Sequence, residues 1–354
     1  MRLSTISSMI IVAAAIPHVS SSKSLVPSPR PAYTNQTADV LAVGHAVRNL
    51  TETVEFYHNL LGLVVLSNDE HYINDLTYAE LTATDGATYR QATIAIPNQA
   101  WTLKLTEYAG IGRTEPKQRE QDPATPGLTL TVKNATEIND VIRAANVSTV
   151  NGEPVPQGTG TNTTSTVWVY DPDGYMVELV QRSGPSDYFT VPEPNIQNGT
   201  GMKYIIRGQL DLTLANYTQA LTFYADILKF NVTPGFEPLI GPNEYEQVGY
   251  IGSVFNISSN VTWAAVTGNC DPVTRCEYYE YDDPNRVAQI APASDIGIGL
   301  TYYAVHDLDG ILDQVRAANL TIVTTGGQPV TVSGTRSILI RDPSGYLVLL
   351  EEEL

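Results

Sequence analysis

The sequence predicts an α+β protein made of two tandem domains with the same succession of strands and helices. Three observations predict it: an internal duplication, alternating strand and helix patterns in each copy, and a segment rich in Pro, Gly and Ser between the copies. The chain of 354 residues is long enough for about two domains. The expected divisions are a signal peptide at 1–22, a first domain at 38–182, a linker at 183–203 and a second domain at 204–354.

Three segments recur in the same order and mark the duplication. NLTETVEFYHNLLGL, which begins at Asn49, matches NYTQALTFYADILKF, which begins at Asn216. A RAAN motif follows in each copy, and YDPDGYMVELV, from Tyr170, matches RDPSGYLVLLE, from Arg341. The matched positions lie 167, 173 and 171 residues apart. Offsets this constant indicate that both copies share one architecture.

Each copy is expected to open with a strand, because apolar residues alternate over 40–47 and 205–214. A helix follows, since apolar residues recur at helical spacing and Asn49 or Asn216 offers an N-cap. A second strand (128–132 and 300–305) and a second helix ending in RAAN come next. A final hairpin turns at DPDG or DPSG, a strong turn signal between apolar runs.

The first residues are typical of a secretory signal peptide: Arg2 lies near the start, and a short apolar run ends before Pro17. We therefore expect a protein that is secreted or held in the secretory-pathway lumen. Asn-x-Ser/Thr sequons support this expectation. Leaving aside Asn49 and Asn216, which are expected helix caps, the candidate glycosylation sites are Asn35, Asn134, Asn146, Asn162, Asn198, Asn231, Asn256, Asn260 and Asn319.

Composition limits the partners and the cysteine chemistry. With 20 Lys and Arg against 38 Asp and Glu, the net charge of −18 argues against nucleic acid and anionic membrane surfaces. Cys270 and Cys276 lie in one loop, where an oxidising compartment would favour a small disulfide; two unpaired thiols are the alternative. The expected partner is a small molecule, and the oligomeric state stays open.

In its helix motif, its closing D-P-D-G-Y-x-V-E-L motif and its duplication, the chain resembles the vicinal oxygen chelate superfamily. This is the glyoxalase/bleomycin-resistance/extradiol-dioxygenase fold, and the resemblance covers the chain from about residue 38. It implies βαβββ modules, two of which form a half-open barrel around one cavity. This chain would then contain two such glyoxalase-like domains.

The resemblance also implies where a metal would lie. Metal-using members take His, Gln or Glu ligands from inward positions of the first and last strands of each module. Counting from the helix caps and turns places these positions at Ala42, Lys104, Gly127 and Glu178 in the first copy, and at Gln209, Val266, Leu300 and Leu349 in the second. One carboxylate and one amide do not make a catalytic metal site, so no divalent metal cofactor is expected. His45 is expected in the core, His18 in the signal peptide, and His58, His71 and His306 at the surface. For His71, which lies beside Asp69 and Glu70, a pocket rim is the alternative.

Four charged residues remain as candidate catalytic groups. Lys104 and Glu178 could face each other as a buried acid/base couple, or as a structural ion pair that replaces a metal site. Asp211 and Glu351 could act as proton shuttles, or could face solvent at an open barrel edge. Among the inward positions of the second copy, Gln209 and Tyr302 are candidate ligand-binding residues.

Three functions follow from these residues. The first is metal-independent acid/base chemistry on a small oxygenated metabolite, of an isomerase, lyase or cyclase type. The second is a non-catalytic protein that binds a small molecule. The third is a metal-dependent dioxygenase or glyoxalase-like lyase, which the ligand positions favour least. The fold by itself does not decide among them.

Overall fold

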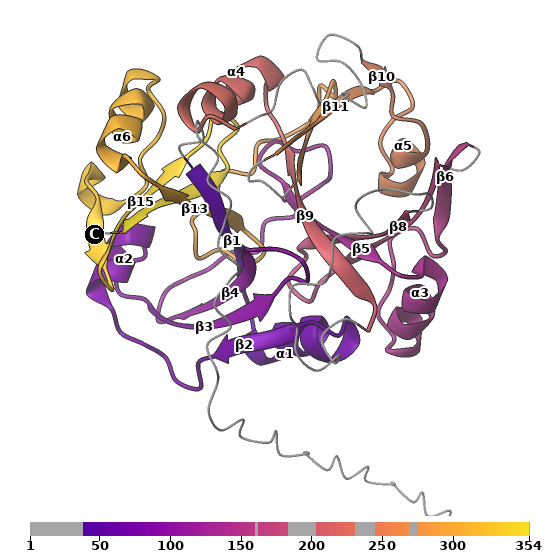
Figure 1. Ribbon diagram of the computed structural model, residues 1–354, viewed down its shortest axis with the longest axis horizontal. Coiled ribbons are helices and arrows are strands. Elements are labelled where there is room, and N and C mark those ends of the chain that lie inside the picture. The colour runs from indigo at the N-terminus through magenta and orange to yellow at the C-terminus, as the bar shows by residue number, and fades with distance from the viewer. Residues whose placement is uncertain (1–37, 160–161, 183–202, 231–244, 270–274, 354) are drawn as a thin grey trace, which may run out of the picture.

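The computed structural model describes residues 38–159, 162–182, 203–230, 245–269 and 275–353. The expected signal peptide and most of the expected linker lie outside these residues. The structure confirms the predicted α+β fold, which contains two eight-stranded mixed sheets. In Figure 1 the two sheets lie side by side, with helices around them.

The first copy contains two modules of strands and helices. The elements of module 1 are β1 (Ala38–Val47), α1 (Leu50–Glu55) with the π-helix η1 (Phe56–Leu60), β2 (Val64–Asn68), α2 (Leu76–Thr82), β3 (Thr88–Ala95) and β4 (Thr102–Ala109). The elements of module 2 are β5 (Pro126–Val132), α3 (Ala135–Ala144), β6 (Val155–Thr159), β7 (Asn162–Tyr170) and β8 (Met176–Arg182).

The second copy repeats this order. The elements of module 3 are β9 (Ile205–Thr213), α4 (Tyr217–Leu221) with the π-helix η3 (Thr222–Ile227), β10 (Glu246–Gln247), α5 (Gly249–Phe255), β11 (Thr262–Asn269) and β12 (Arg275–Tyr281). The elements of module 4 are β13 (Gly299–Val305), α6 (Leu308–Ala317), the 3₁₀-helix η4 (Thr325–Gly327), β14 (Val330–Val332), β15 (Thr335–Arg341) and β16 (Leu347–Glu353).

Side-chain caps begin the main helix of every module. Asn49 accepts hydrogen bonds from the backbone N–H groups of Thr51 and Glu52 at the start of α1. Asn134, Asn216 and Asp307 cap α3, α4 and α6 in the same way. Each cap satisfies backbone donors that the first helical turn leaves without a partner. The caps expected at Asn49 and Asn216 are therefore confirmed.

Each sheet combines one module from each sequence copy. Sheet A, in the order β14-β15-β16-β13-β1-β4-β3-β2, joins modules 1 and 4, whereas sheet B, in the order β10-β11-β12-β9-β5-β8-β7-β6, joins modules 2 and 3. The first strands of the two modules pair antiparallel in the middle, as β1 with β13 and β5 with β9. The first and last strands of each module pair parallel, as β1 with β4 and β9 with β12. The sheets therefore do not follow the two sequence copies.

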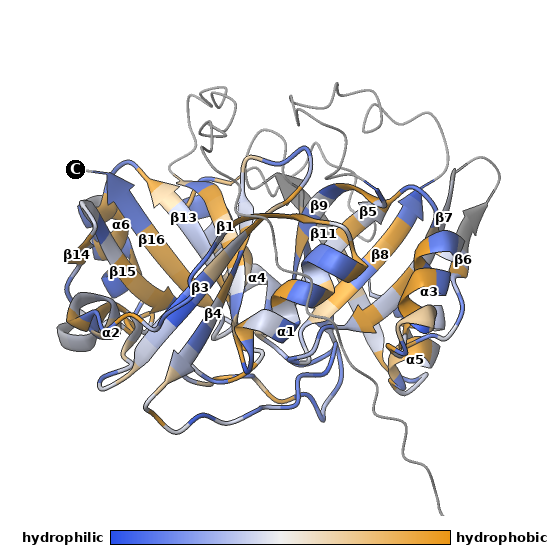
Figure 2. Ribbon diagram, turned by 90° about the horizontal axis from the view of Figure 1, so that it is seen from below, coloured by the Kyte–Doolittle hydropathy of each residue, from blue (hydrophilic) through white to orange (hydrophobic). Residues whose placement is uncertain are grey.

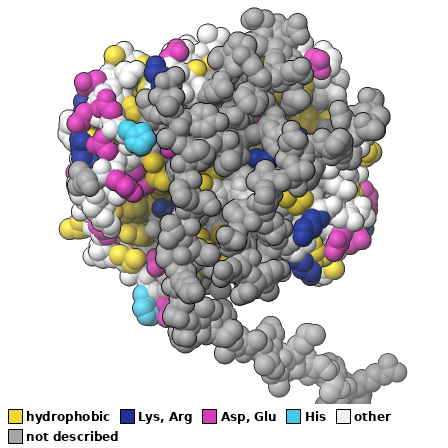
Figure 3. All heavy atoms as spheres, viewed as in Figure 1, with side chains coloured by type: hydrophobic (Ala, Val, Ile, Leu, Met, Phe, Trp, Pro, Cys, Tyr) yellow, Lys and Arg dark blue, Asp and Glu magenta, His cyan; other side chains and the backbone are white. Residues whose placement is uncertain are grey.

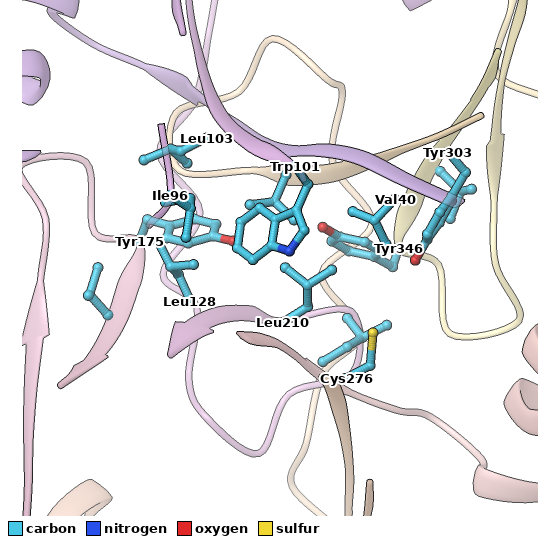
Figure 4. Close-up of a cluster of buried hydrophobic side chains, with 14 of the residues drawn as sticks. Val40, Ile96, Trp101, Leu103, Leu128, Tyr175, Leu210, Cys276, Tyr303 and Tyr346 are labelled. Carbon is cyan, nitrogen blue, oxygen red and sulfur yellow. The ribbon is translucent and has the colours of Figure 1, made fainter. Parts of the chain in front are cut away.

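The largest hydrophobic core lies between the sheets and beneath the helices. Figure 2 shows that β8 and β16 are largely hydrophobic, and this core includes Val177 and Leu179 of β8 and Val348 and Leu350 of β16. Figure 4 shows side chains of both sheets meeting there: Trp101, beside β4, lies near Leu210 of β9 and Tyr346, beside β16. Gly208 of β9 is required by this packing, because a Cβ would lie 2.6 Å from Ile96 and 2.8 Å from Trp101.

The outer surface carries much of the negative charge. Figure 3 shows acidic side chains gathered around α6. Some of them are paired there, as Arg336 is with Asp309 at 2.6 Å and with Glu352 at 2.8 Å. Within the described residues, no helix is both long and apolar enough to cross a membrane.

Candidate active site

Sheet B curls around a cavity of about 270 Å³. The residues that line it come from β7, β8, β9, β11 and β12, from α5 and from the turn before β5. They are mainly aromatic and acidic: Glu120, Thr164, Thr166, Trp168, Met176, Glu178, Val180, Arg182, Asp211, Tyr250, Ile251, Phe255, Trp263, Glu277, Tyr279 and Tyr281.

The strand register brings three of the carboxyl groups to the cavity floor. Thr129 of β5 pairs with Glu178 of β8, while Gly127 of β5 pairs with Asp211 of β9. Asp211 in turn pairs with Glu277 of β12. Side chains alternate between the two faces of a strand, so these carboxyl groups share the face opposite to α3 and α4, which pack against β8 and β12.

The Thr129 hydroxyl lies between two of these carboxyl groups. It donates a hydrogen bond to Glu178 Oε2 at 2.6 Å and makes a very short contact with Asp211 Oδ2. A hydroxyl has one proton to donate, so a proton on one of the carboxyl groups would allow both contacts to be hydrogen bonds. Gln209 donates from Nε2 to the other Asp211 oxygen at 3.0 Å. The geometry therefore suits a carboxyl pair that shares a proton.

Burial in the cavity wall favours the protonated forms of these carboxyl groups. Burial, opposed by the Thr129 hydroxyl, raises the pKa of Glu178 to about 7. Burial and the carboxylates of Glu277 and Glu178 raise the pKa of Asp211 well above its ordinary range. Burial likewise raises the pKa of Glu120 to about 7, although Tyr281 donates to it at 3.0 Å. Near neutral pH the cavity can thus supply acid groups and accept protons.

Aromatic side chains form the walls above this floor. Trp263 lies 5.7 Å from Tyr279 and 6.0 Å from Tyr281 between ring centroids. On the other side, Trp168 lies 6.0 Å from Tyr250 and 5.6 Å from Phe255, both on α5. The Tyr279 hydroxyl also donates to Glu277 Oε2 at 2.6 Å. Such walls offer flat surfaces with a few polar atoms, as small-molecule sites commonly do.

The corresponding face of sheet A is filled by its own side chains. A second hydrophobic cluster covers it and includes Leu81 of α2, Leu300 of β13 and Leu349 of β16. Lys104 lies in this half, with Nζ 4.2 Å from the centroid of the Tyr302 ring. Burial lowers the pKa of Lys104, and the charge of Glu351 opposes that change. Sheet A therefore encloses an ammonium where sheet B has a cavity.

The predicted catalytic residues are brought together in a different combination from the expected one. Lys104 lies in β4 of sheet A and Glu178 in β8 of sheet B, so the expected couple of these two residues does not form. Lys104 interacts electrostatically with Glu351 instead. Glu178 has Asp211 as its neighbour through Thr129. The partners are exchanged because each sheet joins modules of different copies.

Sequence reasoning missed Glu277, because it placed the second position of the second copy at Val266. Val266 lies in β11, whereas β12 is the strand parallel to β9. A usable signal existed in the sequence: LKLTEY and CEYYEY share a Glu-Tyr end at an offset of 173. The structure supports that alignment, since Glu107 accepts from the N–H of Leu50 and Glu280 from the N–H of Tyr217. Glu277 is therefore the counterpart of Lys104.

The carboxyl groups of the cavity do not converge as the ligands of a metal centre do. With the register corrected, the four positions in sheet B are Thr129, Glu178, Asp211 and Glu277, which include no imidazole. In the described part of the chain, three potential ligand atoms converge only at a different place.

The other place is a buried group of His45, Asp171 and Asp173, whose ligand atoms all lie within 4.8 Å of one another. His and carboxylate ligands suit a divalent transition metal, so this group could bind one. His45 Nε2 lies 2.7 Å from Asp171 Oδ2, and the ring stacks on Tyr175 at 4.2 Å. As the sequence predicts, His45 lies in the core.

The second copy indicates a structural role for most of this group. Asp171 accepts from the N–H groups of its own turn and from the Tyr57 hydroxyl at 3.1 Å. Asp342 makes the same contacts, including one with the Tyr224 hydroxyl at 2.9 Å. Position 212, the counterpart of His45, is Leu. The aspartates therefore fix the hairpin turn to the helix in both copies, with or without a histidine.

The residues expected to be modified are only partly within the described chain. Among the sequons, Asn134, Asn146, Asn256, Asn260 and Asn319 are exposed. Asn35, Asn198 and Asn231 lie outside the described residues, as does Cys270, and the Asn162 side chain is not described. Glycosylation and the disulfide stay predictions.

Comparison with known proteins agrees with this architecture. A family model described as the Glyoxalase/Bleomycin resistance protein/Dioxygenase superfamily matches residues 40–179 and 207–350. The chain belongs to this superfamily, which is the one that its motifs resemble. No curated protein matches the chain.

Solved structures show the same fold. Glyoxalase I from Zea mays is 18% identical, with 90% of this chain and 93% of that chain covered and a TM-score of 0.55. A candidate dioxygenase from Bacillus subtilis is 13% identical, with 90% and 86% covered and a TM-score of 0.51. At these identities the likeness concerns the fold, so the function must be argued from the site.

Proposed function

We propose that this protein is an enzyme that acts on a small oxygenated molecule in the cavity of sheet B by proton transfer. The observation that carries the proposal is the Thr129 hydroxyl between the buried carboxyl groups of Glu178 and Asp211, a position from which it can link the two through hydrogen bonds. A protonated carboxyl group beside a cavity can act as a general acid. Isomerisation and elimination need one such acid and one base and consume no redox cofactor.

The acidic residues of the cavity floor have different roles in the proposed proton transfer. Asp211, with Gln209 on one oxygen and Thr129 on the other, holds the proton that is donated. Glu178 is the partner that shares the proton across Thr129 and can take it back. Glu277 adjoins Asp211 on β12 and is positioned by Tyr279, so it is the candidate base for a second site on the same substrate.

The aromatic walls would hold the substrate against this floor. Trp263 and Trp168, from β11 and β7, lie among the aromatic residues of the cavity lining. Stacking on such rings orients a flat molecule without consuming the polar atoms of the floor. Binding without turnover is the alternative that these walls also support.

Deuterium incorporation can test the proposal without a known substrate. Purified protein is incubated with a metabolite extract in D₂O, and mass spectrometry records the compounds that gain deuterium or are converted. Enzymatic proton transfer predicts such compounds for the wild type and their loss in Asp211→Asn and Glu178→Gln. The surface variant Glu55→Gln should behave as the wild type, because Glu55 is exposed on α1.

Each other result has a definite meaning. Conversion that survives in both carboxyl variants would contradict the proposed roles. Retention of a compound without conversion would favour the non-catalytic alternative. Conversion that a chelator abolishes and one divalent metal restores would favour a metal-dependent reaction, with His45 as the first residue to replace.

We also propose that the protein is secreted and glycosylated, with support from the N-terminal pattern and the exposed sequons. Expression in a eukaryotic secretory host should place it in the medium with a mass that falls after peptide-N-glycosidase treatment. An unchanged mass, or retention of the full chain in the cytosol, would contradict this.

A further inference from the structure

Sheet A contains a buried cation at the place that corresponds to the cavity of sheet B. The Lys104 ammonium lies over the Tyr302 ring at 4.2 Å and interacts with the charge of Glu351. A cation over an aromatic face is attracted by the negative charge density of the ring. In this half, therefore, a covalently attached cation occupies the space between the sheet and its aromatic side chains.

Sheet B has the same plan without the attached cation. The counterpart of Lys104 is Glu277, since each residue pairs across parallel strands with the equivalent residue of the neighbouring strand: Lys104 with Gly44, and Glu277 with Asp211. Gly44 and Asp211 also differ by 167 positions, the offset of the duplicated helices. At these two positions sheet B has two carboxyl groups, whereas sheet A has an ammonium and a glycine.

The charges of the cavity are correspondingly unbalanced. Among its described lining residues there are four carboxyl groups, Glu120, Glu178, Asp211 and Glu277, and one cation, Arg182. Arg182 lies at the end of β8, where its charge acts to lower the pKa of Glu178. A buried carboxyl group that ionises without a cation beside it is costly, and a ligand that carries a positive charge would reduce that cost.

The walls suit the same kind of ligand. The ring centroids of Trp263 and Tyr279 lie 5.7 Å apart. The Tyr279 hydroxyl donates a hydrogen bond to Glu277, so this aromatic pair adjoins the carboxyl group. Indole and phenol rings attract cations most strongly among the aromatic side chains. Aromatic faces and carboxylates therefore both favour a positively charged ligand.

We propose that the cavity of sheet B binds an organic cation, an amine or quaternary ammonium compound, whose charged nitrogen lies between Glu277 and the aromatic wall. This names the substrate class for the proposed function and rests on it for the statement that the bound cation is converted. Binding itself does not depend on that conversion, so the two can fail separately.

A series of probes with one ring and different charges tests the proposal on the wild-type protein. The probes are benzylamine, benzyltrimethylammonium, benzyl alcohol and benzoate, titrated at pH 7.5 while tryptophan fluorescence is recorded. Of the three tryptophans in the chain, Trp168 and Trp263 line the cavity and Trp101 lies in the core, so binding should change the emission. The proposal expects each cation to bind at least about tenfold more tightly than benzyl alcohol, and benzoate to bind weakest.

Two variants locate the charge that is recognised. Glu277→Gln should weaken benzyltrimethylammonium about tenfold and leave benzyl alcohol unchanged, because the amide keeps the shape and loses the charge. Glu55→Gln, at an exposed position, should change neither. Circular dichroism checks that each variant is folded, and the probe series on the wild type decides the question if Glu277→Gln does not fold.

The results that overturn the inference are definite. Benzyl alcohol binding as tightly as the cations, benzoate binding most tightly, or no cation binding at millimolar concentration would each do so. The proposed function is judged separately by the dependence of metabolite conversion on Asp211. Cation binding without conversion would support the ligand class and contradict the enzyme, whereas conversion of neutral metabolites alone would do the reverse.

Discussion

Replacing Glu120 by Gln should remove a pH-dependent penalty on the folded protein. Burial raises the pKa of Glu120 from 4.5 to about 7. Between these values the folded state keeps a proton that the unfolded state loses, so the free energy of unfolding falls as pH rises through this window. At 1.36 kcal/mol per pKa unit, the loss is about 3 kcal/mol and is complete above pH 7. Gln carries no charge, and its amide oxygen can still accept from Tyr281.

Urea unfolding at pH 5 and pH 8 measures this effect. The free energy of unfolding of Glu120→Gln, relative to the wild type, should be higher at pH 8 than at pH 5 by about 2–3 kcal/mol. Glu55→Gln, at an exposed position, should show the same difference from the wild type at both pH values. An equal difference at both pH values for Glu120→Gln would refute the reasoning, because it would mean that Glu120 is ionised in the folded state.

Three further predictions concern the repeated architecture and the site. Tyr57→Phe and Tyr224→Phe each remove a hydrogen bond to a turn aspartate. Each should lower the free energy of unfolding, measured by thermal denaturation, by about 1.5–3 kcal/mol. An unchanged melting temperature would show that these bonds do not stabilise the fold. Gly44→Ala would place a Cβ 2.1 Å from Lys104 O, so unfolding in urea should show a loss of about 1–3 kcal/mol or more. Dialysis against a chelator should leave metabolite conversion unchanged.

Much of the local structure could be predicted because it depends on neighbouring residues. The Asn49 and Asn216 caps, the helical spacing after them and the DPDG and DPSG turns are short-range features, and the structure contains all of them. The burial of His45 also followed from the period of its strand. These features need only the residues within a few positions of one another.

The candidate site could be predicted residue by residue but not as an assembly. Glu178 and Asp211 were expected to be inward and acidic, and they line one cavity. Their meeting across Thr129 was not foreseen, since β5 and β9 come from different copies. Glu277 was missed because the second position of the second copy was assigned to the neighbouring strand, β11.

The sequence by itself determined the duplication, the order of the elements, the face on which each side chain lies and, through the motifs, the superfamily. Only the tertiary structure decided that module 2 shares a sheet with module 3, and module 1 with module 4. The physical reason is that alternation along a strand specifies which side chains are buried, whereas the edge to which the strand bonds is specified by distant residues. This pairing of modules places Lys104 in sheet A and Glu178 in sheet B. Side chains fill the concave face of sheet A, whereas sheet B encloses an acidic cavity.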